Sequence, residues 1–96
     1  MPKGYYYVYI ATNPGKSVLY TGVTSDLKRR VSQHRESRGK QSSFAGKYYC
    51  YKLVYYEAYS DVRDAISREK AIKNMSRELK EALIQERNPR WNVLKI

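Results

Sequence analysis

The segment GYYYVYIA at residues 4–11 constrains the fold most, because aromatic and β-branched residues fill it and helix signals are absent. Alternation along a strand would place Tyr5, Tyr7 and Tyr9 on one face and Tyr6, Val8 and Ile10 on the other. The following TNPGKS supplies the Asn, Pro and Gly that are typical of a turn, and residues 18–22 return as a second strand. The sequence therefore predicts an antiparallel hairpin.

A helix and a third strand follow the hairpin. Ser25 is the expected N-cap of a helix that runs to about Arg35, with Asp26 placed favourably in its first turn. The Gly- and Ser-rich stretch 36–49 is typical of a surface loop. The sequence YKLVYYEAY at residues 51–59 predicts the third strand.

Two further helices complete the expected order. Ser60 would cap a helix over residues 61–75, and Ser76 would cap another that runs to about Arg87. Pro89 cannot continue that helix, so NPRW ends it. The order β-β-α-β-α-α predicts an α/β (α+β) fold, with a small three-stranded antiparallel sheet flanked by helices.

The length of 96 residues suits one compact core, so a single domain over residues 1–96 is expected. Its core motif region would span about 4–80, and the C-terminal helix and NPRW tail about 76–96. One Cys and one His exclude an internal disulfide and a Cys- or His-based zinc cage. No apolar stretch approaches the roughly 20 residues that cross a bilayer, so we expect a soluble, cytoplasmic protein.

The formal net charge of +10 favours a polyanionic partner, with nucleic acid first and an anionic membrane surface second. The charge is concentrated in residues 25–40, the first helix and the loop after it. The candidate substrate-binding residues there are Lys28, Arg29, Arg35, Arg38 and Lys40. Eleven tyrosines add a second signal, because a Tyr-rich sheet can stack bases.

Ionisable residues occupy positions where helix packing prefers aliphatic ones. On the first helix, Arg30 and His34 fall on the apolar stripe that is set by Leu27 and Val31. On the second helix, Glu69 lies near the middle of the apolar face formed by Val62, Ala65, Ile66 and Ile72. Burying a carboxylate costs several kcal/mol unless it is paired, hydrogen-bonded or bound to a metal. Two interpretations remain open: Glu69 simply pairs with Arg30 beside a satisfied core-edge His34, or these residues form a site.

Taken together, these residues resemble a GIY-YIG nuclease domain. Tyr7-Val8-Tyr9 is similar to the first motif element and Tyr20-Thr21-Gly22 to the second, although Tyr7 replaces the usual glycine and Thr21 the usual aliphatic residue. The matching residues beyond them are Arg30, His34, Glu69 in AISREKAIK, and Asn88 in NPRW, with Asn92 as a competing choice. The strand LVYYE and the NPxW ending are most similar to the small stand-alone members of the family.

The resemblance implies a metal-dependent endonuclease that hydrolyses phosphodiester bonds in DNA, of the structure-specific kind used in repair or recombination. It implies that Glu69 holds one Mg²⁺ or Mn²⁺ ion and that Arg30 contacts the phosphate oxygens. Tyr20 would be the general base with Tyr9 assisting it, His34 would position the water or the tyrosines, and Asn88 would lie on the substrate side.

Two other hypotheses stay open. One is a non-catalytic nucleic-acid-binding module that uses the Tyr-rich sheet and the basic helix. The other makes the domain one part of a larger repair or recombination complex with protein partners. The sequence favours DNA over RNA as the partner and leaves substrate structure and oligomeric state undecided.

Overall fold

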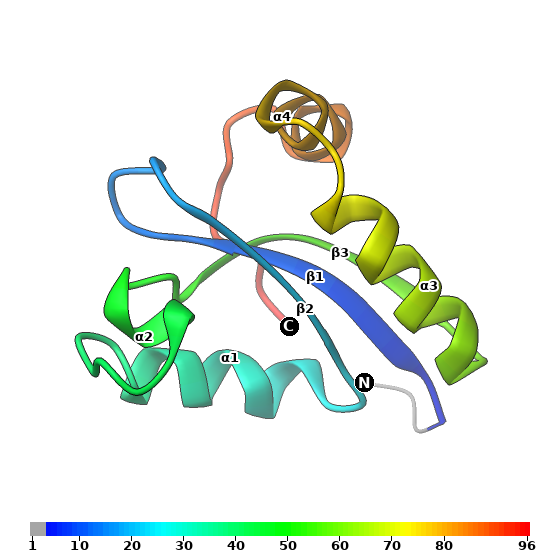
Figure 1. Cartoon of the computed structure of the whole chain (residues 1–96), viewed down its shortest axis with the longest axis horizontal. Coiled ribbons are helices and arrows are strands. Elements are labelled where there is room, and N and C mark those ends of the chain that lie inside the picture. The colour runs from blue at the N-terminus through cyan, green and yellow to red at the C-terminus, as the bar shows by residue number, and fades with distance from the viewer. Residues whose placement is uncertain (1–3) are drawn as a thin grey trace.

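A computed structural model describes residues 4–96 of the chain. The elements follow in the order β1 (Tyr6–Thr12), β2 (Leu19–Thr24), α1 (Leu27–Glu36), α2 (Phe44–Lys47), β3 (Lys52–Tyr59), α3 (Val62–Lys73) and α4 (Arg77–Arg87). The three strands form one antiparallel sheet in the order β2-β1-β3. Figure 1 shows α1 and α2 on one side of this sheet and α3 and α4 on the other. The predicted α+β fold with a three-stranded antiparallel sheet is confirmed.

The central strand β1 pairs with both other strands and so sets their register. Tyr9 lies opposite Gly22 of β2 and opposite Tyr56 of β3, and a bulge interrupts the pairing with β3 between Ile10 and Ala11. The side chain of Asn13 orders the hairpin turn, because its Oδ1 accepts the backbone N–H groups of Ser17 and Val18, at 2.8 and 3.0 Å. The hairpin therefore forms as predicted, with strands slightly offset from the expected bounds.

The two faces of β1 enter two separate hydrophobic clusters. Tyr7 and Tyr9 pack beneath α1 with Leu27, whereas Val8 and Ile10 pack beneath the other helix layer. The cluster on that second side also contains Ala65, Ile72 and Ile84. The predicted alternation is confirmed for β1. Because Tyr7 and Tyr9 are at most 4% exposed, they offer no open stacking surface.

Two helix starts differ by one residue from the prediction. Asp26 is the N-cap of α1, where its Oδ1 accepts the backbone N–H of Arg29 at 3.0 Å, so the expected cap Ser25 was wrong. Asp61 likewise replaces Ser60 as the cap of α3. Asp and Ser cap almost equally well, so adjacent candidates are hard to separate by residue type. The predicted cap of α4, Ser76, is confirmed.

The stretch expected to be a surface loop contains a short helix, α2. Ser43 caps it and accepts the backbone N–H of Gly46 at 3.0 Å. Gly46 is buried against the preceding turn, and a Cβ there would lie 2.6 Å from the carbonyl oxygen of Ser37. The fold therefore fixes this segment against the end of α1. Within residues 4–96, no helix is both long enough and apolar enough to cross a membrane.

Candidate active site

Three ring-bearing side chains meet between the sheet and α1. Tyr9 of β1 is fully buried, and its hydroxyl forms a 2.7 Å hydrogen bond with Nε2 of His34 on α1. Tyr20 of β2 lies beside both, with its ring centroid 6.2 Å from that of Tyr9 and 5.3 Å from that of His34. The structure thus brings together three of the four predicted catalytic side chains.

Gly22 makes room for this cluster. It lies directly across the hairpin from Tyr9, and a Cβ built at position 22 would fall 2.6 Å from the Tyr9 hydroxyl oxygen. The distances to two further ring atoms would also be below 3.0 Å. The glycine is therefore required by the close approach of the Tyr9 ring rather than by a special backbone angle.

The environment keeps Tyr9 and His34 uncharged near neutral pH. Burial, reinforced by the neighbouring Tyr20, raises the pKa of Tyr9 far above its usual value, although the positive charge of Arg30 opposes this. Burial, and then the charge of Arg30, lowers the pKa of His34. Because both groups are neutral, their hydrogen bond joins a protonated phenol to an uncharged imidazole. Tyr9 is therefore suited to donating or orienting rather than to removing a proton.

Arg30 and Glu69 come from α1 and α3, helices that lie on opposite sides of the sheet (Figure 1). Both charges act on Tyr9: that of Arg30 lowers its pKa and that of Glu69 raises it. The Glu69 side chain is 16% exposed, and its ion pair is with Lys73 one turn later, at 3.5 Å. The alternative that Glu69 pairs simply with Arg30 is therefore not what the structure contains.

An open cavity of about 480 Å³ lies over this cluster. Its walls come from β2, α1, the turn after α1, and α2. The lining residues are Tyr20, Arg30, Gln33, His34, Ser37, Ser43, Phe44 and Ala45. Tyr20, Arg30 and His34 can thus be reached together by a ligand, whereas Tyr9 lies beneath them.

The metal-binding capacity rests on a single carboxylate. Within residues 4–96, no group of three or more His, Cys, Asp or Glu side chains is placed to hold a metal ion. Mg²⁺ needs no such group, because it keeps several of its waters and is commonly bound through one or two carboxylates and substrate phosphates. Glu69 supplies one such carboxylate, but it is not among the residues that line the cavity.

The predicted basic residues are on the surface of α1 and the turn after it. Lys28, Arg29, Arg35, Arg38 and Lys40 are all exposed. Arg38 is partly held in place, since its guanidinium donates to the carbonyl of Arg35 at 2.6 Å and lies 5.8 Å from the ring of Tyr51.

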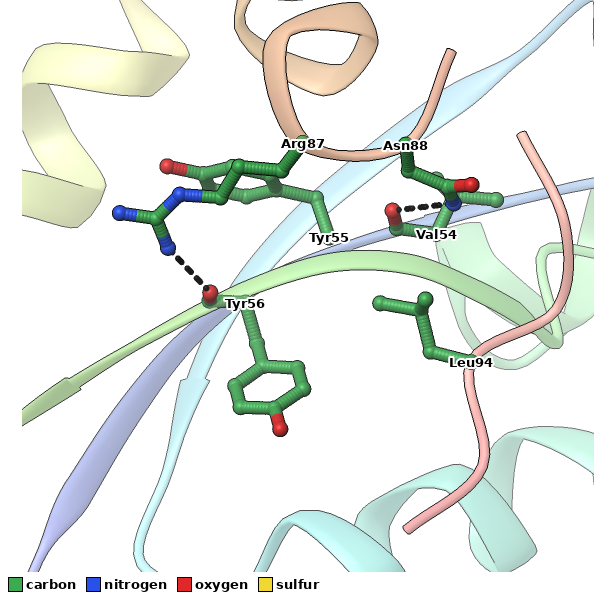
Figure 2. Close-up of a pocket in the computed structure, with 6 residues that line it drawn as sticks. All are labelled: Val54, Tyr55, Tyr56, Arg87, Asn88 and Leu94. Atoms are coloured by element: carbon green, nitrogen blue, oxygen red, sulfur yellow. Dashed lines mark hydrogen bonds between the residues drawn. The ribbon is translucent and has the colours of Figure 1, made fainter. Parts of the chain in front are cut away.

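Asn88 lies elsewhere, on the α4 side of β3. Its side-chain amide is buried and donates to the carbonyls of Val54 and Asn92, at 2.9 and 2.8 Å, while its oxygen accepts the backbone N–H of Asn92. Figure 2 shows Asn88 beside a cavity of about 290 Å³, with Arg87 stacked along Tyr55 and donating to the carbonyl of Tyr56. The structure therefore does not gather Asn88 with Tyr9, Tyr20 and His34.

Sequence reasoning missed one wall of the cavity. Ser43, Phe44 and Ala45 belong to the segment that was expected to be a loop, yet they face Tyr20 and His34 across the opening. One signal in the sequence could have found it. Phe44 follows two serines in a polar stretch, and an apolar ring in such a stretch indicates a local structure against which it packs.

Comparisons with known proteins agree with this architecture. The family model of the GIY-YIG catalytic domain matches residues 5–82. A UPF0213 protein of Haloquadratum walsbyi is 38% identical over 82 residues, which is 85% of this chain and 89% of that protein. One from Clostridium perfringens is 39% identical and covers 85% of each chain. The solution structure of a UPF0213 protein from Bacillus halodurans is similar with a TM-score of 0.57 and 30% identity, over 91% of this chain and 89% of that one.

Proposed function

We propose that this chain, which belongs to the family of the GIY-YIG catalytic domain, is a metal-dependent endonuclease that cleaves DNA. Membership itself places the chain in a nuclease family. The observation that carries the proposal is the convergence of Tyr20, Arg30 and His34 on one open cavity, with Tyr9 hydrogen-bonded beneath them. A structural ion pair would not need these groups to face an opening.

The two tyrosines would have different tasks. Tyr20 is half-buried and lines the cavity, so in its phenolate form it would be placed to accept the proton of the attacking water. Tyr9 is buried with a raised pKa, so it stays protonated and fixes the position of His34. His34 in turn lies against Tyr20 and can orient both the ring and the water.

Charge on the phosphate would be neutralised from two directions. Arg30 would contact the non-bridging oxygens, for which its planar guanidinium is well suited. Glu69 would hold a Mg²⁺ or Mn²⁺ ion, which when bound would lower the pKa of a coordinated water and stabilise the developing charge. The exposed residues Lys28, Arg29 and Arg35 would follow the nucleic-acid backbone, as would Arg38 and Lys40.

The competing hypothesis of a non-catalytic module keeps only part of its support. It relied on tyrosines of the sheet as a stacking surface, and three of them, Tyr7, Tyr9 and Tyr55, are each at most 4% exposed. The other strand tyrosines are partly exposed. Asn88 also has a sufficient structural explanation, because its amide already holds the C-terminal segment against β3. A setting in repair or recombination, and a partner protein there, remain predictions from the family.

The proposal is tested by incubating the purified protein with single-stranded, flapped, nicked and duplex DNA, with Mg²⁺, Mn²⁺ or EDTA. Glu69→Ala and Arg30→Ala should each lower cleavage by about 100-fold, because each removes a charge that stabilises the transition state. Glu86→Ala and Arg90→Ala, which change exposed residues outside the cavity, are the matched controls and should retain activity. Cleavage that persists in EDTA, or in both active-site variants, would contradict the assignment.

A further inference from the structure

Two exposed aromatic rings belong to α2 and the residue after it, and one of them lines the cavity. Phe44, the first residue of α2, is 51% exposed, and Tyr48, directly after α2, is 40% exposed. We call these two residues the α2 aromatic wall. Phe44 also lines the cavity that contains Tyr20, Arg30 and His34. The wall is therefore continuous with the site at which the phosphate would react.

The rings of the wall are ordered relative to the site. The Phe44 ring is stacked on Tyr20, with centroids 6.1 Å apart and planes inclined by 27°. The Phe44 ring also packs against that of Tyr48, with centroids 4.7 Å apart. The Ser43 cap and the close seat of Gly46 on the turn after α1 hold α2 in place. The exposed aromatic face is thus presented in a fixed position.

The surroundings of the wall favour an anionic partner. Lys47 lies 5.5 Å from the ring of Tyr48, and the exposed Arg38 and Lys40 come from the turn on which α2 is seated. An apolar peptide would gain nothing from these cations. A nucleotide satisfies both features at once, because its base has an aromatic face and its phosphate is negative.

We infer that the α2 aromatic wall stacks on the base of an unpaired nucleotide next to the phosphate that Arg30 contacts. This inference rests on the proposed function and names the substrate class within it. Bases inside a duplex are stacked on one another, so their faces are not available to Phe44. The wall would therefore favour single strands, flaps and frayed ends, and would act as a specificity element rather than in the chemical step.

Binding measured without metal tests the inference separately from cleavage. A fluorescent 12-mer DNA strand and its duplex would be titrated with the wild-type protein, Phe44→Leu and Phe44→Trp. Phe44→Leu should weaken binding of the single strand by about tenfold and leave the duplex within twofold, because it removes a base–aromatic contact. Phe44→Trp should retain strand binding, and its added indole fluorescence should be quenched by the strand. Leu79→Ala, at a 58% exposed apolar residue on α4, is the control and should bind as wild type.

The inference would be overturned by equal losses for strand and duplex in Phe44→Leu, by no loss at all, or by loss of strand binding in Phe44→Trp. Sedimentation of the free proteins addresses self-association. A wild-type dimer that Phe44→Leu dissociates would assign the wall to contact between copies and would also overturn it. Selective strand loss without metal-dependent cleavage would keep the stacking site and reject the nuclease. Metal-dependent cleavage, together with unchanged strand binding in Phe44→Leu, would keep the nuclease and reject the stacking site.

Discussion

Tyr9 combines a packing role with a polar one at a single position. Its ring fills the space beneath α1, and its hydroxyl reaches His34 on that helix. This arrangement depends on the empty space at Gly22, which no larger residue would leave. The contribution of this empty space to stability can be measured by adding a single methyl group at position 22.

Gly22→Ala should destabilise the protein by about 2 kcal/mol, because the new Cβ must displace the buried ring of Tyr9. The displaced hydroxyl should also lose its bond to His34. Gly15→Ala is a matched control in the same hairpin, since its Cβ would have no neighbour closer than 3.9 Å. Denaturant unfolding should separate the two variants, and equal midpoints would show that the Tyr9 ring adapts at no cost.

The orientation of these residues could be predicted, whereas their contacts could not. The helical period placed Arg30 and His34 on the inward stripe, and the resulting site expectation agrees with His34 being 8% exposed. The bond from His34 to Tyr9 joins residues 25 positions apart, and no local pattern specifies such a distance. The partner of Glu69 was also open, and it is Lys73.

Between elements, one carboxylate links β3 to α3. Glu57 accepts hydrogen bonds from the hydroxyls of Tyr55 and Tyr59 and is bridged by the guanidinium of Arg68, with Nε at 2.9 Å. Burial alone would raise the pKa of Glu57, but the hydrogen bonds from Arg68, Tyr55 and Tyr59 outweigh it and lower this pKa to about 2. The same interaction, with burial, raises the pKa of Tyr55 to about 12.

Glu57→Gln should lower the free energy of unfolding by roughly 2 kcal/mol at pH 7, because Arg68 loses its charged partner in a half-buried site. The folded pKa of about 2 lies below the ordinary 4.5, so the ionised carboxylate contributes stability above pH 4.5. That contribution is lost as the pH falls from 4.5 towards 2. Thermal unfolding from pH 7 to 2.5 should therefore show a smaller acid-induced loss for Glu57→Gln than for Glu86→Gln, an exposed control. Parallel pH curves for the two would refute the linkage.

The order of the main strands and helices could be predicted from the sequence, but the short helix α2 and the caps of α1 and α3 could not. Aromatic and β-branched runs predicted the strands, and capping residues together with an apolar stripe predicted the longer helices. The four-residue α2 is too short to show a period, and its stability comes from the Ser43 cap and the burial of Gly46. The caps of α1 and α3 were displaced by one residue because Ser-Asp pairs offer two nearly equal acceptors.

At the scale of the whole molecule, the C-terminal segment joins both helix layers. After α4 it passes along β3, where the backbone N–H of Leu94 donates to the carbonyl of Leu53 at 2.9 Å. Leu94 and Ile96 then pack with the cluster beneath α1, on the opposite side from α4. Asn88 anchors the start of this crossing. The segment also covers part of the open edge of β3, which limits pairing with other strands.

Asn88→Ala should destabilise the protein by about 2 kcal/mol, because it leaves the buried carbonyl of Val54 without its donor and releases Asn92. Asn92→Ala is the matched control, since Asn92 contributes its backbone groups to these bonds and its side chain is exposed. Urea unfolding compares them. If Asn92→Ala lowered the free energy of unfolding more than Asn88→Ala, the side chain of Asn92 rather than that of Asn88 would anchor the segment.

The register of the hairpin has a consequence for folding. Gly22 stands opposite Tyr9, with Thr21 and Val23 on either side of it in β2. A slip by one residue would turn the faces of β2 over and set a branched side chain where the Tyr9 ring needs space. A mispaired chain could therefore form neither the core beneath α1 nor the phenol–imidazole bond. Gly22 thus selects the correct register sterically. Any molecule that assembles the site has already paired β1 and β2 correctly.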